Sequence, residues 1–274
     1  MPNNLLVSIV TPVRNDRKYI ARCIQSVLLQ EYPHIEHVIV DGASTDGTLD
    51  IISNYSKKFP QRIRFISEPD NGGADAWNKG LKMAKGDIFG AIGADDIYTP
   101  GAIKLVVDFF SSHPDAYFIC GDCENIDPEG NKMLTSKAKF YTFKKFVNTA
   151  GFLAITSAFY KREVMEKIGW LEHSDDDFDV LLRMAKNFEV HTIDKVLSVL
   201  MVRPNSGFNS PANFQRLHEV RKQTFETSRR HGGRLLSLLA LRHYAITVID
   251  LFSLERFYPY LRDTYKKIRK IAKT

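Results

Sequence analysis

The sequence predicts an α/β fold in which a mostly parallel central sheet is flanked by helices and followed by a helical C-terminal extension. Two observations support this. Apolar runs of strand length alternate four times with helical stripes over residues 5–96, and the turns between them are rich in Gly, Asp and Asn. The chain has 274 residues, of which 44% are hydrophobic and 26% charged, so it is long enough to bury such a core.

Strand and helix patterns follow one another closely in the first half of the chain. Parallel strands need a crossover connection, so this order predicts right-handed βαβ units. The expected elements are a strand at 5–11, a helix at 21–28, a strand at 36–40, a helix at 49–55, a strand at 63–67, a helix at 74–84 and a strand at 88–94.

The second half is less regular. Thr99 and Pro100 predict the N-cap and the first position of a helix that runs to about Ser112. We expect residues 1–210 to form one domain and residues 211–274 to form the helical extension. The other expected elements are strands at 116–121, 158–161 and 190–202, a short helix at 163–168 and a helix that opens at residues 175–177.

The positive charge is concentrated in the C-terminal extension. Residues 216–274 contain 14 Lys and Arg against 5 Asp and Glu, a net +9 within a total of +6 for the chain. Long aliphatic runs interleave with these charges, unlike a solvated basic arm, so nucleic-acid binding is not expected. The rest of the chain is mildly acidic.

An apolar stretch at residues 235–254 is interrupted by Arg242, His243 and Asp250, which makes a membrane-spanning helix costly. Its wide apolar face and the basic residues of 258–274 are typical of a helix lying on an anionic membrane surface. The alternative is a helix packed on its own domain or on a second subunit of a homodimer.

Residues 5–10 are too short an apolar run for a signal peptide, and three cysteines indicate a reducing compartment without a disulfide framework. We therefore expect a cytoplasmic protein, or one peripheral on the cytoplasmic membrane face. Cys120 and Cys123 form a lone CxxC pair, for which two thiols near a strand end are favoured over a zinc site.

Acidic residues follow two of the predicted strands. Asp95 and Asp96 end the fourth strand, after small residues that allow close approach, and paired carboxylates suit a hard divalent cation. Asp41 ends the second strand, where a carboxylate can accept an N–H of a nucleobase. No glycine-rich phosphate loop follows the first strand, so a bound phosphate would need a metal. The alternatives are a surface turn for the pair and a loop or cap residue for Asp41.

A second acidic cluster, Asp175 to Asp177, opens a predicted helix far along the chain. Acidic residues in a first helical turn complement the helix dipole, so the cluster alone does not indicate catalysis.

Taken together, five linked stretches resemble the motifs of family 2 glycosyltransferases over roughly residues 5–205, in order and spacing. They are VSIVTPVRN (7–15), VIVDGASTDGT (38–48), EPDNGGADAWNKG (68–80) with AKGD (84–87), ADD (94–96) and DDFDVLLR (176–183).

The resemblance implies a GT-A fold and an inverting, hexosyltransferase-type enzyme that uses a nucleotide-sugar donor, UDP favoured over dTDP and GDP. It implies Mn²⁺ or Mg²⁺ as cofactor and a hydroxyl of a glycan or polyprenyl-linked acceptor. By position, it assigns donor binding to Thr11, Pro12, Val13, Asn15, Asp41, Asp75, Asn78, Lys79 and Asp95, metal binding to Asp96 with Asp95, and the general base to Asp177 with Asp176 beside it.

Two positions depart from the family pattern. Arg14 stands where an aromatic residue is common, which leaves base stacking open, and Asp176 stands where Glu is common, which leaves open which acid is the base. The alternative functions are a catalytically inactive nucleotide-sugar-binding subunit and a sugar-phosphate nucleotidyltransferase. Against the latter, Thr11 to Lys18 contains no glycine, whereas such enzymes usually carry a glycine- and arginine-rich loop there.

Overall fold

A computed structural model describes residues 4–139, 142–149, 153–171, 177–203, 222 and 224–234, without the side chains of 145, 149 and 177. The chain divides into two compact units, residues 1–146 with 151–202, and residues 147–150 with 203–274. The predicted domain boundary at residue 210 lies outside the described residues, and so do residues 235–274. The boundary and the membrane or subunit contact of that segment stay predictions.

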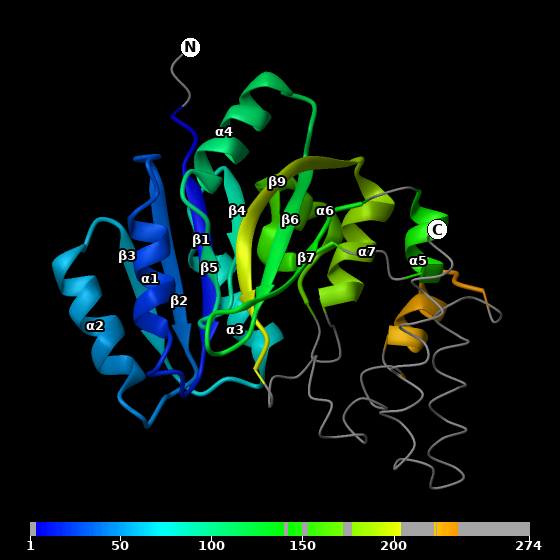
Figure 1. Cartoon of the computed structure of the whole chain (residues 1–274). Helices are drawn as coiled ribbons and strands as arrows, with labels where there is room; N and C mark the ends of the chain where they lie inside the picture. The colour runs from blue at the N-terminus through cyan, green and yellow to red at the C-terminus, as the bar shows by residue number, and fades with distance from the viewer. Residues whose placement is uncertain are drawn as a thin grey trace, which may run out of the picture. The chain divides into compact units, whose positions relative to one another are not determined.

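A nine-stranded sheet forms the first unit, in the order β3-β2-β1-β4-β8-β6-β9-β5, with β7 paired to β6 (Figure 1). Its strands are β1 (Val7–Val13), β2 (Ile35–Asp41), β3 (Ile63–Ser67), β4 (Ile88–Ala91), β5 (Ile97–Tyr98), β6 (Phe118–Ile126), β7 (Lys132–Ser136), β8 (Ala158–Lys161) and β9 (Val190–Met201). Its helices are α1 (Ile20–Leu28), α2 (Thr48–Lys58), α3 (Gly73–Met83), α4 (Ala102–Ser112), α5 (Phe143–Thr149, which continues into the second unit), α6 (Arg162–Ile168) and α7 (Asp177–Asn187).

The first four strands are parallel, as predicted. β1 pairs with β2 so that Val13 lies opposite Asp41, and it pairs with β4 so that Val10 lies opposite Ala91. The chain fills the sheet outward from β1 through β2 to β3 and then returns to place β4 on the other side. This reversal of strand order between β1 and β4 is where open α/β sheets bind ligands.

The other half of the sheet has mixed directions. β8 runs antiparallel to both β4 and β6, β9 runs parallel to β6, and β5 pairs antiparallel with β9. The predicted α/β architecture with a mostly parallel sheet is therefore confirmed for strands β1 to β4, and the antiparallel additions lie beyond them.

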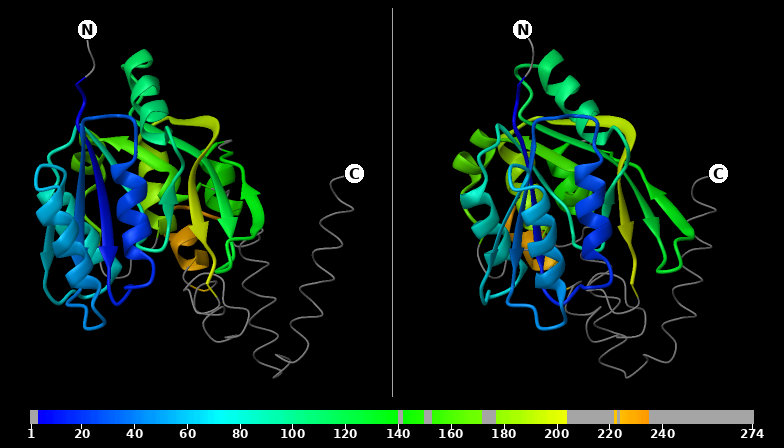
Figure 2. Two further views of the ribbon diagram at one scale, coloured as in Figure 1. Left: turned by 60° about the vertical axis from the view of Figure 1, so that its left-hand side comes forward. Right: turned by 90° about the vertical axis from the view of Figure 1, so that its left-hand side faces the viewer.

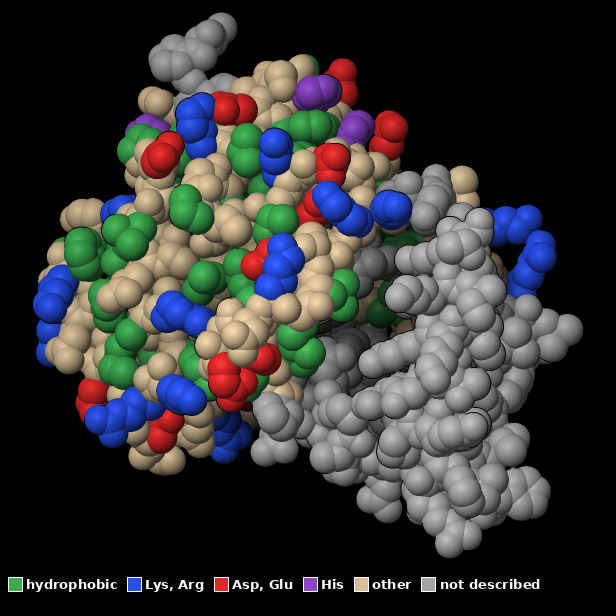
Figure 3. Space-filling model, in the orientation of Figure 1, with side chains coloured by type: hydrophobic (Ala, Val, Ile, Leu, Met, Phe, Trp, Pro, Cys, Tyr) green, Lys and Arg blue, Asp and Glu red, His purple; other side chains and the backbone are tan. Residues whose placement is uncertain are grey.

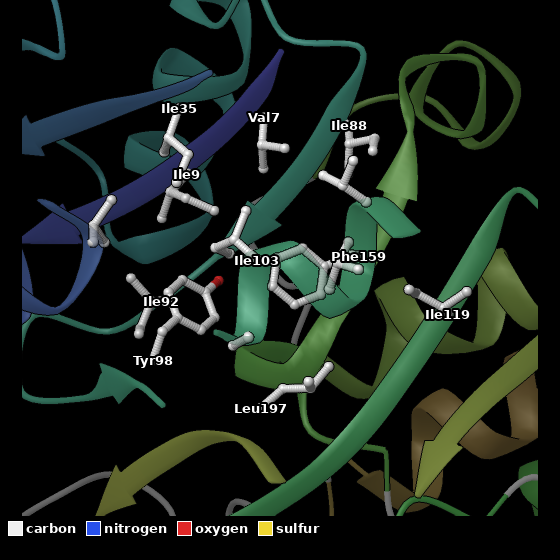
Figure 4. Close-up of a cluster of buried hydrophobic side chains, with 14 of the residues drawn as sticks. Val7, Ile9, Ile35, Ile88, Ile92, Tyr98, Ile103, Ile119, Phe159 and Leu197 are labelled. Carbon is white, nitrogen blue, oxygen red and sulfur yellow. The ribbon is translucent and has the colours of Figure 1, made fainter. Parts of the chain in front are cut away.

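Helices cover both faces of the sheet because buried strands alternate their side chains (Figure 2). Val7 and Ile9 of β1 point to one face, where α1 and α4 pack in a cluster that includes Ile103, Tyr98 and Phe159 (Figure 4). Val10 points to the opposite face and meets α3. There a methyl group on Gly80 would lie 2.3 Å from Val10 Cγ1, so only glycine allows this approach.

Several details differ from the sequence prediction. The helix predicted from Thr99 begins instead at Ala102, with Gly101 as its N-cap in the left-handed region at φ 75°. The Thr99 hydroxyl donates to the Val196 carbonyl at 2.7 Å, so β9 uses the group that was expected to cap the helix. Strands β5 and β7 were not predicted, since one is two residues long and the other is an exposed edge strand.

Basic and acidic side chains are mixed on the surface of the described part. Figure 3, in the orientation of Figure 1, shows Lys and Arg side chains interspersed with Asp and Glu. Cys23, Cys120 and Cys123 are buried thiols without a disulfide, and burial raises the pKa of each. Within the residues that the structure describes, no helix combines the length and apolar character needed to cross a membrane.

The second unit is described at residues 147–149, 203, 222 and 224–234. Residues 224–230 are helical, the Ser228 hydroxyl donates to the Val147 carbonyl at 2.6 Å, and the Arg234 N–H donates to Asn148 Oδ1 at 2.7 Å.

Candidate active site

The carboxyl ends of β1, β2 and β4 meet at one edge of the sheet, and each continues into a loop that carries predicted site residues. Parallel pairing places these ends side by side, so Asn15, Asp41 and the Asp95–Asp96 pair are delivered to one rim. The site is therefore assembled by topology from segments distant in sequence.

The carboxylates of Asp95 and Asp96 converge over Gly93. A methyl group on Gly93 would lie 2.8 Å from Asp96 Oδ2 and 3.1 Å from Asp95 Oδ1, so oxygens of both side chains approach one point. The turn is closed by a hydrogen bond from Asp96 N–H to the Gly93 carbonyl at 3.1 Å. Two adjacent carboxylates with oxygens on one side can present a shared hard-ligand surface to a divalent cation.

Asp96 is buried and held by β9. Only 5% of the residue is exposed, and its Oδ1 accepts a hydrogen bond from the Met201 N–H at 2.9 Å. Asp95 is held on its main chain, because the Arg22 guanidinium donates from Nη2 to the Asp95 carbonyl at 2.7 Å. α1 and β9 thus fix the two acidic residues through different atoms.

Asp41 is fully buried at the end of β2. Its Oδ2 accepts hydrogen bonds from the Ser67 hydroxyl at 2.6 Å and from the Ser44 N–H at 3.1 Å. Its Oδ1 is buried and has no hydrogen-bond partner in the structure. A buried carboxylate oxygen without a donor is costly, so this atom is suited to an N–H supplied by a ligand.

The loops after β1 and β2 brace each other. Asn15 N–H donates to the Ser44 hydroxyl, and Thr45 N–H donates to Asn15 Oδ1, both at 2.8 Å. Asn15 and Ala43 lie in the left-handed region, at φ 54° and 57°. That conformation is readily adopted by Asn and is strained for Ala, and such strain is concentrated at functional sites.

The predicted β1 residues offer the site little side-chain surface. Thr11 is fully buried, and its hydroxyl lies 2.9 Å from Nε2 of His37 inside the fold. Val13 packs in the apolar cluster of α1 and α2, while Pro12 is partly exposed. If Thr11 or Val13 contacts a nucleotide-sugar, the contact would therefore come from its backbone.

The charged residues of α3 form a surface network. Lys79 pairs with Glu68 at 2.9 Å and with Asp75 at 3.2 Å, and it donates to the Pro69 carbonyl at 3.0 Å. Its hydrogen bond to Glu68, followed by that to Asp75, raises the pKa of Lys79. Asp75 also accepts from the Asn71 N–H at 3.1 Å, which ties the loop before α3 to its first turn.

The side-chain amide of Asn78 forms hydrogen bonds with the protein backbone. Its Nδ2 donates to the Leu171 carbonyl at 2.7 Å, and its Oδ1 accepts from the Leu171 N–H at 3.1 Å. The same segment is held by Arg183 of α7, whose Nη1 donates to the carbonyls of Ile168 at 3.1 Å and Trp170 at 3.2 Å. The Asn78 side chain therefore fixes the segment that leads to the second acidic motif.

That second motif is only partly described. Asp175 and Asp176 lie outside the described residues, and Asp177 is the first residue of α7, with no description of its side chain. Asp179, in the first turn of the helix, is buried and pairs with Arg183 at 2.8 Å. The assignment of a general base to Asp177 or Asp176 stays a prediction.

Metal binding would rest on few protein ligands. Among the described side chains, no cluster of three or more His, Cys, Asp or Glu is placed to hold an ion. The two carboxylates over Gly93 still fit Mg²⁺ or Mn²⁺, because such ions are commonly held by one or two carboxylates together with substrate phosphates. No sequence motif marks Arg22 or Met201, whose contacts hold this pair.

Comparisons with known proteins show the family of this chain. The family described as Glycosyl transferase family 2 matches residues 8–169. Chondroitin synthase of Escherichia coli is 37% identical over 126 residues, which are 46% of this chain and 18% of that protein. TuaG of Bacillus subtilis, named for teichuronic acid biosynthesis, is 38% identical over 117 residues, 42% of this chain and 46% of TuaG. The chain thus covers less than half the length of each.

Solved structures show the same fold, the GT-A fold. A mannosyltransferase from Pyrobaculum calidifontis in complex with GDP-Man and Mn²⁺ aligns with a TM-score of 0.64 at 21% identity, over 88% of this chain and 69% of that one. S. aureus TarS in complex with UDP-GlcNAc aligns with a TM-score of 0.61 at 20% identity, over 93% of this chain and 73% of that one.

Proposed function

Because this chain belongs to glycosyl transferase family 2, we propose that it is an inverting glycosyltransferase that moves a sugar from a UDP-sugar to an acceptor hydroxyl. The observation that carries the proposal is the convergence of the Asp95 and Asp96 carboxylates over Gly93, at the switch point between β1 and β4. There they can meet the diphosphate of a donor.

The nucleoside would lie beside Asp41. Its buried Oδ1 has no partner, and the imide N–H of uracil is a donor of the kind it requires. The hydrogen bonds of Asn15 with Ser44 and Thr45 hold the adjoining loops together without a ligand, which lowers the cost of binding. A protein of the same fold holds UDP-GlcNAc, which supports UDP, although another holds GDP-Man.

Asp96 and Asp95 would hold Mn²⁺ or Mg²⁺ against the donor diphosphate. When bound, the ion offsets the negative charge that builds on the departing diphosphate. Asp177, with Asp176 beside it, would accept the proton of the acceptor hydroxyl as that oxygen attacks the anomeric carbon, and the C–O bond to the diphosphate would break on the opposite side. Inversion follows from this single displacement.

Binding and turnover of UDP-sugars test the proposal directly. UDP binding is measured by calorimetry with and without MnCl₂, and UDP release from UDP-, dTDP- and GDP-sugars measures turnover. We expect Asp96→Ala to remove the metal-dependent part of UDP binding and to abolish turnover. Asp108→Ala, which removes an exposed carboxylate of α4, is the matched control. Full activity of the chain in chelator, or normal turnover by Asp96→Ala, would contradict the proposal.

The same assay separates the alternative functions. An inactive nucleotide-sugar-binding subunit would bind UDP-sugar and release no UDP with any acceptor. A nucleotidyltransferase would form nucleotide-sugar from a sugar phosphate and a nucleoside triphosphate, with pyrophosphate as the second product. Release of UDP from a UDP-sugar without pyrophosphate supports the transferase.

We propose that the acceptor is a glycan, in the form of a polyprenyl-linked chain at the membrane surface. The sequence of the extension supports it, with an apolar stretch at 235–254 followed by a basic one at 258–274. The full chain should pellet with anionic vesicles and be released by high salt, and a chain cut near Gly232 should stay in solution. A dimer that dissociates on truncation would favour a subunit contact instead.

A further inference from the structure

Polar side chains at α1 bond to the segment that carries Asp95 and Asp96. Arg22 and Ser26 lie in α1 and Gln30 lies just beyond its end, so the three are spaced four residues apart. With 3.6 residues per turn, this spacing places Arg22 and Ser26 on one face of the helix, and Gln30 follows past its end. From the sequence pattern alone, these polar side chains would be expected to face solvent. In the structure each of them has a hydrogen-bond partner between residues 95 and 103.

Arg22 makes the contact nearest the acidic pair. Its Nη2 donates to the Asp95 carbonyl at 2.7 Å, while its Nε is buried without an acceptor. A buried donor without a partner is destabilising, so Arg22 lowers the stability of the fold at Nε while its Nη2 holds the turn at Asp95. The bond is charge-assisted, which makes it stronger than a neutral one.

Ser26 and Gln30 continue the contact along the chain. Ser26 Oγ accepts from the Tyr98 N–H at 3.2 Å. Gln30 Nε2 donates to the Thr99 carbonyl at 3.0 Å, and its Oε1 accepts from the Ile103 N–H at 3.1 Å. That N–H lies in the first turn of α4, where no intrahelical acceptor exists, so Gln30 satisfies it from outside the helix.

The opposite side of this segment is held by β9 and by the core. Met201 N–H donates to Asp96 Oδ1 at 2.9 Å, and Ile97 pairs with Val199. The Tyr98 ring packs on Phe159, with centroids 5.5 Å apart (Figure 4). The acidic pair therefore lies on a segment fixed from two sides, which is how precise ligand geometry is usually maintained.

We propose that Arg22 is a positioning residue for the metal-binding pair, holding the main chain at Asp95 so that both carboxylates face one ion. This inference rests on the proposed function, since it requires that Asp95 and Asp96 bind a divalent cation. Arg22 acts through the main chain of Asp95 and not through its carboxylate. Loss of Arg22 should therefore lower metal affinity, whereas loss of a purely structural arginine should not.

Arg62 provides the matched control for a structural role. It too is a partly buried arginine that bonds to backbone carbonyls, those of Leu28 at 3.0 Å and Val27 at 3.4 Å at the far end of α1. Arg62→Ala removes the same kind of bond from the same helix without touching residues 95–103. It should lower stability and leave metal affinity unchanged.

The test measures Mn²⁺ binding directly, by electron paramagnetic resonance of the unbound ion in the presence of saturating UDP. Arg22→Ala should raise the dissociation constant for Mn²⁺ by about 10- to 100-fold, the usual cost of losing a group that orients metal ligands. UDP binding without metal should stay unchanged, which also reports that the variant is folded. Arg22→Lys, which keeps a cationic donor, should restore most of the affinity.

The outcomes separate this inference from the function on which it rests. If the unaltered chain binds Mn²⁺ and Arg22→Ala binds it equally well, the positioning role is overturned while the proposed function stands. Equal losses in Arg22→Ala and Arg62→Ala would also overturn it, as they would show a general effect of stability. If the unaltered chain with UDP binds no Mn²⁺, the metal site itself is wrong.

Discussion

A single methyl group at Gly93 should disable the metal site while leaving the fold intact. In Gly93→Ala the new carbon would lie 2.8 Å from Asp96 Oδ2, whereas ordinary contact begins at 3.4 Å. The oxygen must therefore move by about 0.6 Å, and Asp95 Oδ1, at 3.1 Å, must move by about 0.3 Å. Metal–oxygen distances tolerate only about 0.2 Å.

The displacement is also resisted by the surroundings. Asp96 Oδ1 is bonded to the Met201 N–H at 2.9 Å, so turning the carboxylate away from the methyl group weakens a bond to a charged group, worth about 1.5–3 kcal/mol. We expect the dissociation constant for Mn²⁺ in the presence of UDP to rise by about 10- to 100-fold, and turnover at fixed metal to fall in parallel.

Mn²⁺ titration by electron paramagnetic resonance measures the change, and thermal melting checks the fold. Gly73→Ala is the control, because a methyl group there meets no atom within 4 Å and the backbone φ is not positive. Should Gly93→Ala bind Mn²⁺ as tightly as the unaltered chain, the two carboxylates do not share an ion at this point and the placement of the metal is wrong.

Three other predictions address the base, the core and the pH response. Asp177→Asn should keep UDP and metal binding but lower turnover roughly a hundredfold, and Asp176→Asn should lower turnover less. If turnover assays give the reverse ranking, Asp176 is the base. Gly80→Ala, whose methyl group would lie 2.3 Å from Val10, should destabilise the protein by about 1–3 kcal/mol in urea unfolding, and an unchanged midpoint would refute the close packing. Burial lowers the pKa of His37 from 6.5 to about 3, so the folded protein keeps it neutral while the unfolded chain protonates. Stability should therefore fall by about 1.4 kcal/mol from pH 7.5 to 5.5, and His37→Gln should show a smaller fall.

The sequence was sufficient for the parts of the fold that follow from periodicity. Apolar runs and helical stripes predicted strands β1 to β4 and the helices between them, because each is a continuous segment with its own pattern. Asp41 and the Asp95–Asp96 pair were predicted at the ends of the second and fourth strands, and the parallel pairing of β2 and β4 with β1 brings those ends to one rim.

The parts that were missed depend on partners distant in the chain. Thr99 has the sequence signature of a helix cap, but β9 accepts its hydroxyl bond, so tertiary contact overrode a local signal. The bonds of the Asn78 side chain to the backbone of Leu171 join residues 93 positions apart, and no local pattern indicates them. Met201 acts through its main chain, which carries no residue-specific signal.

The anchoring of Asp96 by Met201 also has a consequence for the order in which the protein matures. The two residues are 105 positions apart, so a chain emerging from the ribosome presents both acidic side chains long before β9 exists. Strands β1 to β4 are complete once residue 91 has been synthesised, whereas this bond cannot form until residue 201 has been added. Competence to bind a metal should therefore appear late, after β9 has been synthesised, and a prematurely terminated product would carry the acidic motif without its anchor.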